Sequence, residues 1–151
     1  MIRKATMADV SLMHGMLMTY ADRGLLIGRS VSSIYDKLRD FVVYEENGDV
    51  LGMCALQISW ENLAEIRSLA VVEKAHGKGL GRKLVEACLA EAKDFEISKV
   101  FTLTYEDAFF RKLGFYDIDK KDLPHKIWSD CLHCPKFPNC DENGLMVNLT
   151  L

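Results

Sequence analysis

Residues 69–91 decide the fold of this chain: Leu-Ala-Val-Val-Glu-Lys-Ala-His-Gly-Lys-Gly-Leu-Gly-Arg-Lys-Leu-Val-Glu-Ala-Cys-Leu-Ala-Glu. The apolar run 69–72 predicts a strand, and apolar residues at helical spacing over 84–92 predict a helix. Between them, glycines occupy every second position from Gly77 to Gly81. Glycines let successive backbone N–H groups turn toward one point, and a helix N-terminus adds unpaired donors and partial positive charge. The stretch therefore predicts a strand, an anion-binding loop and a helix.

The glycine spacing separates this loop from two common phosphate loops. A P-loop carries Lys-Ser/Thr after its last glycine, where this chain has Arg82-Lys83, and a dinucleotide fingerprint needs Gly-x-Gly-x-x-Gly. The segment His76-Gly77-Lys78-Gly79-Leu80-Gly81 instead resembles the acetyl-CoA loop of the GNAT superfamily of N-acetyltransferases, Gln/Arg-x-x-Gly-x-Gly/Ala, with His76 at the Gln/Arg position. The resemblance implies that acetyl-CoA is the cosubstrate and that its pyrophosphate binds here. A Gly-rich turn without a ligand is the alternative.

A second motif stands further along the chain. Residues 108–115, Ala-Phe-Phe-Arg-Lys-Leu-Gly-Phe, follow a predicted strand at 99–103 and resemble the family's Phe-(Phe/Tyr)-x-x-Leu-Gly-Phe helix, which Gly114 is expected to end. Two motifs in order are more specific than either alone. The resemblance covers residues 1 to about 118 and implies an α/β GNAT fold: a mixed, mostly antiparallel, twisted sheet with helices on both faces. It also implies that the strands of 69–71 and 100–103 splay apart to form the acetyl-CoA cleft.

Other patterns predict the remaining elements. Ile2–Ala5 reads as a strand, Thr6 as the N-cap of a helix that runs to about Asp22, and Ser30 as the cap of a second helix. Asn47-Gly48 between apolar runs predicts a hairpin. Alternation predicts a last strand over 145–151.

The strand predicted at 63–72 carries a charged pair, Glu65 and Arg67. Its period of two places one set of side chains on one face and a second set on the other. The first set is Glu65, Arg67, Leu69 and Val71, and the second is Ile66, Ser68, Ala70 and Val72.

Composition narrows the class of protein. The 151 residues predict one domain, 1–151, with a Cys-rich segment at 125–141, and 49% apolar and 27% charged residues are ordinary for a globular protein. A net charge of −3 gives no electrostatic footprint for nucleic acid or an anionic membrane, and no apolar run is long enough to span a bilayer. Five cysteines without a secretory signal predict a cytoplasmic protein. A homodimer is left open.

Acetyl transfer to an amine needs a neutral amine, a polarised carbonyl, a protonated leaving thiolate and aligned substrates. The strand pattern places Glu65 near the start of the cleft, which predicts a general base acting through water; a solvated strand residue or a salt bridge with Arg67 is the alternative. Tyr105 follows the strand at 99–103, where the resemblance implies a tyrosine that protonates the coenzyme A sulfur; aromatic packing is the alternative. The resemblance also implies that backbone N–H groups near Val71 polarise the thioester carbonyl.

The resemblance assigns a set of residues to the acetyl-CoA site. They are Leu69, Ala70, Val71, His76, Gly77, Lys78, Gly79, Leu80, Gly81, Arg82, Phe109 and Lys112.

Three segments look like the acetyltransferase domain of N-acetylglutamate synthases: Gly24–Ser30, Glu65–Val71 and Thr102–Tyr105. The tail from 126 to 141 is similar to the stand-alone, short form of that enzyme. The resemblance implies L-glutamate as the acceptor and the first step of arginine biosynthesis. A dicarboxylate needs two cationic forks, for which Arg29 and Arg67 are the candidates, although either alone would read as a surface arginine.

The cysteine-rich segment has two readings. Cys131, Cys134 and Cys140 have the spacing and neighbours for a small zinc site, with His125, His133 or Asp141 nearby. A second Cys-x-x-Cys pair is missing, and Pro135 and Pro138 suggest a rigid loop. We therefore favour a loop of packed or redox-labile thiols and expect no metal.

Other functions remain open at this point. A related acetyltransferase for another small amine or a protein N-terminus would share everything but the dicarboxylate pocket. A non-catalytic acetyl-CoA-binding or zinc-binding regulator would not need Glu65 and Tyr105. The apolar loop at 25–27 reads either as a lid beside a substrate pocket or as ordinary core packing.

Overall fold

The computed structural model describes residues 1–25, 28–124 and 142–151. The described strands form a seven-stranded sheet in the order β1-β2-β3-β4-β5-β7-β6. The strands are β1 (Ile2–Lys4), β2 (Phe41–Glu46), β3 (Asp49–Trp60), β4 (Leu63–Val71), β5 (Lys99–Thr104), β6 (Tyr116–Ile118) and β7 (Asn143–Asn148). The helices are α1 (Val10–Asp22), α2 (Val31–Asp36), α3 (Leu80–Asp94) and α4 (Asp107–Lys112), with 3₁₀ helices at Met7–Asp9, Leu38–Asp40, Glu73–Ala75 and Lys120–Asp122.

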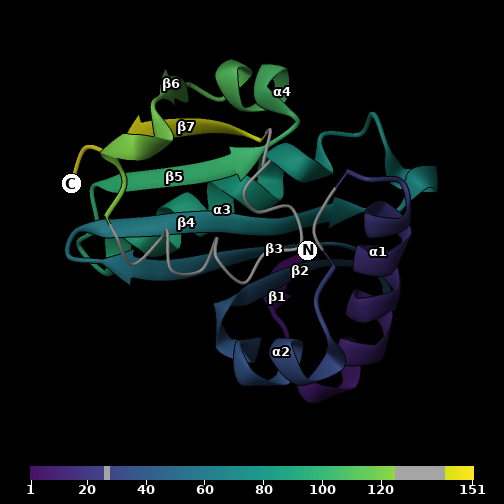
Figure 1. The fold of residues 1–151 in the computed structure, drawn as a ribbon. Coiled ribbons are helices and arrows are strands. Elements are labelled where there is room, and N and C mark those ends of the chain that lie inside the picture. The colour runs from purple at the N-terminus through teal and green to yellow at the C-terminus, as the bar shows by residue number, and fades with distance from the viewer. Residues whose placement is uncertain (26–27, 125–141) are drawn as a thin grey trace.

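The sheet is mixed and mostly antiparallel, as expected. Among the described strands, β4 and β5 form the one parallel pair, and α3 is the crossover between them (Figure 1). The last strand of the chain, β7, lies between β5 and β6. The sequence predicted that this strand would continue to the end of the chain, but it ends at Asn148, and Leu151 is 66% exposed.

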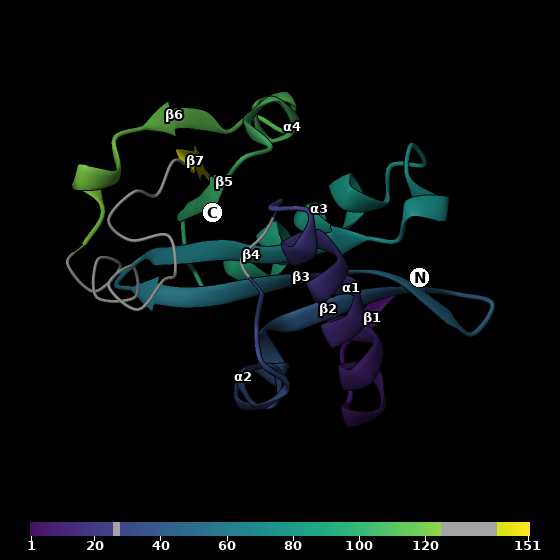
Figure 2. The same ribbon diagram turned by 45° about the vertical axis from the view of Figure 1, so that its right-hand side comes forward.

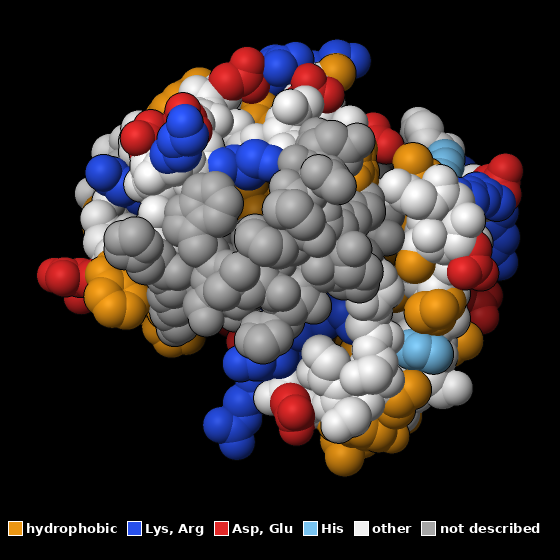
Figure 3. All heavy atoms as spheres, in the orientation of Figure 1, with side chains coloured by type: hydrophobic (Ala, Val, Ile, Leu, Met, Phe, Trp, Pro, Cys, Tyr) orange, Lys and Arg blue, Asp and Glu red, His pale blue; other side chains and the backbone are white. Residues whose placement is uncertain are grey.

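Helices cover both faces of the sheet (Figure 2). The α1–α2 face buries Val10, Met13 and Leu17 of α1 against β2 and β3, and the opposite face buries Leu84 and Cys88 of α3. Each helix therefore turns an apolar stripe to the core. Hydrophobic side chains lie at the surface on the side of the molecule where α1 runs (Figure 3). Within α1, Leu12 is 58% exposed.

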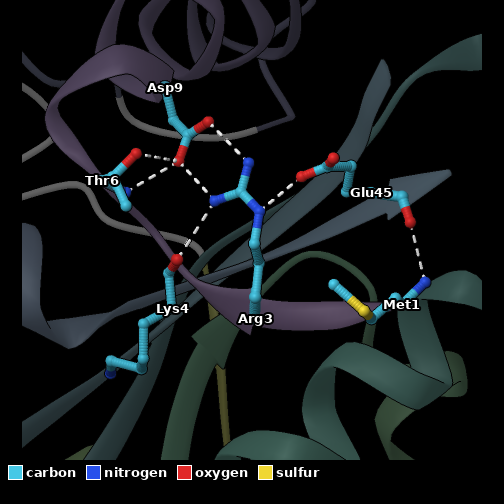
Figure 4. A network of polar contacts seen from close by, with 6 residues as sticks. All are labelled: Met1, Arg3, Lys4, Thr6, Asp9 and Glu45. Carbon is cyan, nitrogen blue, oxygen red and sulfur yellow. Dashed lines mark hydrogen bonds and ion pairs between the residues drawn. The ribbon is translucent and has the colours of Figure 1, made fainter. Parts of the chain in front are cut away.

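An ionic network ties β1 to the start of the first helical segment (Figure 4). The Arg3 guanidinium donates to both carboxylate oxygens of Asp9, at 2.8 and 3.0 Å, and also to Glu45. The Asp9 carboxylate accepts from the backbone N–H of Thr6 at 2.7 Å, so the predicted cap at Thr6 is confirmed, although the first turn is 3₁₀. The hydrogen bonds from Arg3 hold the pKa of Asp9 below its usual range.

Turn residues adopt the conformations that their sequence predicted. Asn47 and Gly48 both have positive φ, 53° and 83°, as a two-residue hairpin between β2 and β3 requires. The Ser30 hydroxyl accepts from the Ser33 N–H at 3.0 Å and caps α2. Gly114, with φ of 95°, follows α4 where its motif predicted the end of that helix.

Candidate active site

The cleft of the molecule lies where β4 and β5 separate. The two strands pair from Leu63–Lys99 to Ile66–Thr102, and beyond this point β4 continues to Val71 without β5 beside it. A cavity of about 500 Å³ opens there, lined by residues 66–71 of β4 and 102–104 of β5. The expected splay of these strands is confirmed.

The glycine loop borders this cavity and is built for close backbone approach. Gly77 and Gly79 have φ of 79° and 77°, a left-handed conformation that costs glycine little, and α3 begins directly after Gly79. A Cβ on Gly81 would lie 3.3 Å from Cζ of Phe109, so glycine lets α4 pack close to the start of α3. The loop thus offers unpaired N–H groups at a helix N-terminus.

Most of the residues predicted for the acetyl-CoA site line this cavity. Those that do so are Leu69, Ala70, Val71, His76, Gly77, Gly79, Leu80, Gly81, Arg82 and Phe109. Of the predicted set, Lys78 and Lys112 are absent from the described lining. Arg82 also pairs with Glu86 of its own helix at 2.7 Å, and the Lys83 ammonium lies over the ring of Tyr44, 5.8 Å from its centroid.

Sequence reasoning missed several lining residues. Tyr20, Thr102, Glu106 and Phe110 all border the cavity. Phe110 belongs to the motif at 108–115, whereas Tyr20 lies far in the sequence from the glycine loop, and no motif around it indicated a place in the cofactor site. Leu25, from the predicted lid, also lines the cavity, while residues 26–27 lie outside the described part of the chain.

The two faces of β4 carry different chemistry because the strand has a bulge. Arg67 pairs with Ala55 and Ala70 with Met53, so β4 holds one more residue than β3 across this interval. The extra residue is accommodated at Ser68, whose φ is 55°.

The bulge overturns the predicted alternation of β4. Before it, Ile66 faces α3; after it, Leu69 and Val71 pack on the α3 side and Ala70 on the α1–α2 side. Glu65 and Arg67 therefore lie on the face opposite to Leu69 and Val71, because one inserted residue reverses every side chain that follows.

Arg29 and Arg67 lie beside the bulge, close enough for their charges to repel each other. Nη1 of Arg29 lies 3.4 Å from the Ser68 hydroxyl, and its Nε donates to the Ser33 hydroxyl at 3.2 Å. Nη1 of Arg67 donates to Oε1 of Gln57 at 2.9 Å. Burial, reinforced by the charge of Arg67, lowers the pKa of Arg29 to about 10. The two guanidinium groups have neutral hydrogen-bond partners and the Glu65 carboxylate beside them, and such a pair is suited to binding an anion.

The two predicted catalytic residues lie on different strands. Glu65 is buried, and its Oε1 lies 4.0 Å from Nε of Arg67, the distance of a long salt bridge. The salt bridge with Arg67 is therefore present, and the role of Glu65 as a general base stays a prediction. Tyr105 is half-buried just after β5, at a turn where the Thr104 hydroxyl accepts from the Glu106 N–H at 2.8 Å. Thr104 and Glu106 line the cavity, and Tyr105 is not among the described residues that do so.

The predicted thiol loop belongs to the segment 125–141. Cys131, Cys134 and Cys140 lie outside the described residues. Within 1–25, 28–124 and 142–151, no group of three or more His, Cys, Asp or Glu side chains could hold a metal ion. No helix in these same ranges is long and apolar enough to cross a membrane.

Comparisons with known proteins agree with this geometry. Residues 19–115 match the acetyltransferase (GNAT) family. An uncharacterized N-acetyltransferase of Chlorobaculum tepidum is 41% identical over 98% of this chain and 96% of that protein, and an amino-acid acetyltransferase of Mycobacterium tuberculosis is 31% identical over 85% of this chain and 75% of that protein.

Solved structures share the fold. A Mycobacterium tuberculosis protein in complex with CoA superposes with a TM-score of 0.87 at 26% identity and covers 99% of both chains. The N-acetylglutamate synthase of Neisseria gonorrhoeae, complexed with coenzyme A and N-acetyl-glutamate, superposes with a TM-score of 0.89 at 22% identity. This chain spans 35% of that longer protein.

Proposed function

Because this chain belongs to the acetyltransferase (GNAT) family and is an acetyl-CoA-dependent N-acetyltransferase, we propose that its acceptor is the α-amine of L-glutamate. The product would be N-acetylglutamate, formed by direct transfer, and the reaction would open arginine biosynthesis.

The observation that carries this proposal is the convergence of Arg29 and Arg67 beside Ser68. Burial and the charge of Arg67 disfavour the charged form of Arg29 more than the nearby Asp40 and Glu65 carboxylates favour it, and the two carboxylates of glutamate would supply further ionic partners. The relation to an amino-acid acetyltransferase supports an amino acid as the acceptor. The fold shared with a glutamate-acetylating enzyme is consistent with this class of acceptor.

The cofactor side of the site has the features that acetyl-CoA requires. The splayed strands offer an extended backbone edge, and the glycine loop offers N–H donors for a pyrophosphate. When bound there, acetyl-CoA supplies the acetyl thioester. Three groups of this chain would then act on the reactants. Glu65 would accept a proton from the substrate ammonium through water, and Tyr105 would donate a proton to the departing sulfur. Backbone N–H groups of β4 would polarise the thioester carbonyl.

A test of the base is the pH–rate profile of Glu65→Gln. Loss of the carboxylate should lower the rate and move the requirement for a deprotonated amine to higher pH. An unchanged profile would assign that deprotonation to bulk water and leave Glu65 as the ionic partner of Arg67.

The experiment that tests the acceptor is a screen of the twenty amino acids with acetyl-CoA, read as released thiol. Glutamate should react fastest, and glutamine should be far poorer because a half-buried guanidinium loses its ionic partner. Robust acetylation of a polyamine or a peptide amine, with glutamate inert at millimolar concentration, would overturn the glutamate proposal. The family and the cofactor would be unaffected by that result.

A further inference from the structure

A tyrosine from α1 reaches into the splayed part of the sheet. The Tyr20 hydroxyl donates to the backbone oxygen of Val71 at 2.7 Å and accepts from the Val71 N–H at 3.2 Å. Nε2 of His76 lies 2.8 Å from the same oxygen and 3.0 Å from the tyrosine hydroxyl. A nitrogen that close to a carbonyl oxygen must carry a proton, so His76 donates from Nε2 and helps to hold the hydroxyl in place.

These backbone groups of Val71 face the cleft. The adjacent Val72 N–H donates to Leu51 O of β3 at 2.9 Å, so the groups of Val71 point to the opposite edge of β4. The partner strand on that edge stops pairing at Ile66–Thr102. Among the described residues, the contacts with Tyr20 and His76 are the ones made to the Val71 edge of β4, which an extended amide chain could join as a strand would.

The pantetheine arm of acetyl-CoA is such a chain, because it contains two secondary amides. We propose that the Tyr20 hydroxyl, held by His76, stands where a pantetheine amide binds Val71, so that the cofactor enters by displacing it and this pair sets the affinity for the cofactor. The inference rests on the proposed placement of acetyl-CoA between β4 and β5.

The surroundings of Tyr20 leave room for this exchange. A second cavity of about 210 Å³ also borders Tyr20 and His76, and it is lined further by Met16 and Thr19 of α1 and by Arg23, which follows this helix. Tyr20, Val71 and His76 border both cavities. Tyr20 is half-buried and His76 is exposed, so a small rotation of the ring toward the second cavity frees the edge of β4.

Removal of the hydroxyl should therefore strengthen cofactor binding. We compare Tyr20→Phe with the wild type by titration calorimetry, using CoA as the probe. The dissociation constant should fall about three- to tenfold, because the hydroxyl and its hydrogen bonds to Val71 no longer compete with the cofactor. Tyr35→Phe is the matched control, because Tyr35 lies in α2, is 47% exposed and borders neither cavity; its affinity should not change.

A merely structural role for Tyr20 would not produce this result, since damage to the site weakens binding. Equal affinity in Tyr20→Phe and the wild type would overturn the proposal. Weaker binding would also overturn it and would show that the hydroxyl holds the cofactor. If Gly79→Asp leaves CoA affinity intact, the placement of the cofactor is wrong; if Gly79→Asp removes binding while Tyr20→Phe does not tighten it, only the displacement is wrong.

A second measurement needs no variant of Tyr20. The ring centroids of Tyr20 and His76 are 6.5 Å apart in the free protein, close enough for a nuclear Overhauser contact between their protons. This contact should be present in the free protein and lost when CoA is bound. Its persistence in the complex would contradict displacement, even if Tyr20→Phe failed to fold.

Discussion

The two halves of the site are made in different ways. The cofactor half consists largely of backbone: the consecutive residues 76–82, in which Gly77 and Gly79 have positive φ, and the edge of β4 at 69–71. The proposed acceptor half consists of side chains from three separate places: Arg29 before α2, Gln57 on β3 and Arg67 on β4. A site made of backbone depends on local sequence, whereas a site made of side chains depends on how distant elements pack.

The bulge at Ser68 is the boundary between these halves. It turns Glu65 and Arg67 to one face of β4 and Leu69 and Val71 to the other. A cofactor and an acceptor can therefore approach one strand from different sides and meet at the point where it kinks. Each half can be disabled by itself, which gives the following tests.

Gly79→Asp should have the largest effect and disable the cofactor half alone. A Cβ here meets no heavy atom within 4 Å, and Asp tolerates the left-handed conformation better than most residues, so the chain should fold. The carboxylate would repel a pyrophosphate at the helix N-terminus, and CoA binding by calorimetry should be lost. Gly79→Asn, nearly equal in size but neutral, should retain much of the binding; equal loss in both variants would point to strain instead of charge.

Tyr105→Phe tests whether the side chain of Tyr105 contributes to catalysis in the cofactor half, which consists largely of backbone. Loss of the proton donor should lower kcat by about 10²–10⁴-fold, while the affinity for CoA stays nearly constant. Steady-state kinetics and calorimetry on the same preparation separate the two. A kcat within twofold of the wild type would assign Tyr105 to packing.

Arg67→Ala should disable the acceptor half alone. Loss of one charge-assisted fork should raise KM for glutamate about 10- to 100-fold, with CoA affinity unchanged. Arg29→Ala should act in the same direction. Arg39→Ala removes an exposed arginine nearby and serves as the control. Equal effects of all three variants on KM would mean that general charge, and no defined carboxylate site, attracts the substrate.

Asp9→Asn should have the smallest effect and touch neither half. Asp9 is 4% exposed and bonded to Arg3, so the change should lower the free energy of unfolding by about 1–3 kcal/mol at pH 7. Because the folded pKa of Asp9 lies below its ordinary 3.8, its contribution is present above that value and is lost as pH falls through the folded pKa. Urea unfolding at several pH values should show the two proteins converge in acid. A constant difference at all pH values would rule out the ionic origin.

The sequence by itself determined those parts of the protein in which a residue dictates its own backbone. Asn47-Gly48 required a tight hairpin, the alternate glycines required an open loop before α3, and Gly114 required an end to α4. Each depends on sterics within a few residues, so the cofactor half and most of the element order could be predicted.

Tertiary structure decided what depends on pairing between distant segments. A serine at position 68 does not by itself predict a bulge. The register between β3 and β4 requires one there, and the bulge reverses the faces to which the later side chains of β4 point. Likewise, the packing of α1 on the sheet brings Tyr20 to Val71, and the insertion of β7 between β5 and β6 sets the order of that edge. The reason is physical: such contacts join residues far apart in the chain, and their free energy exists only once the whole sheet has formed.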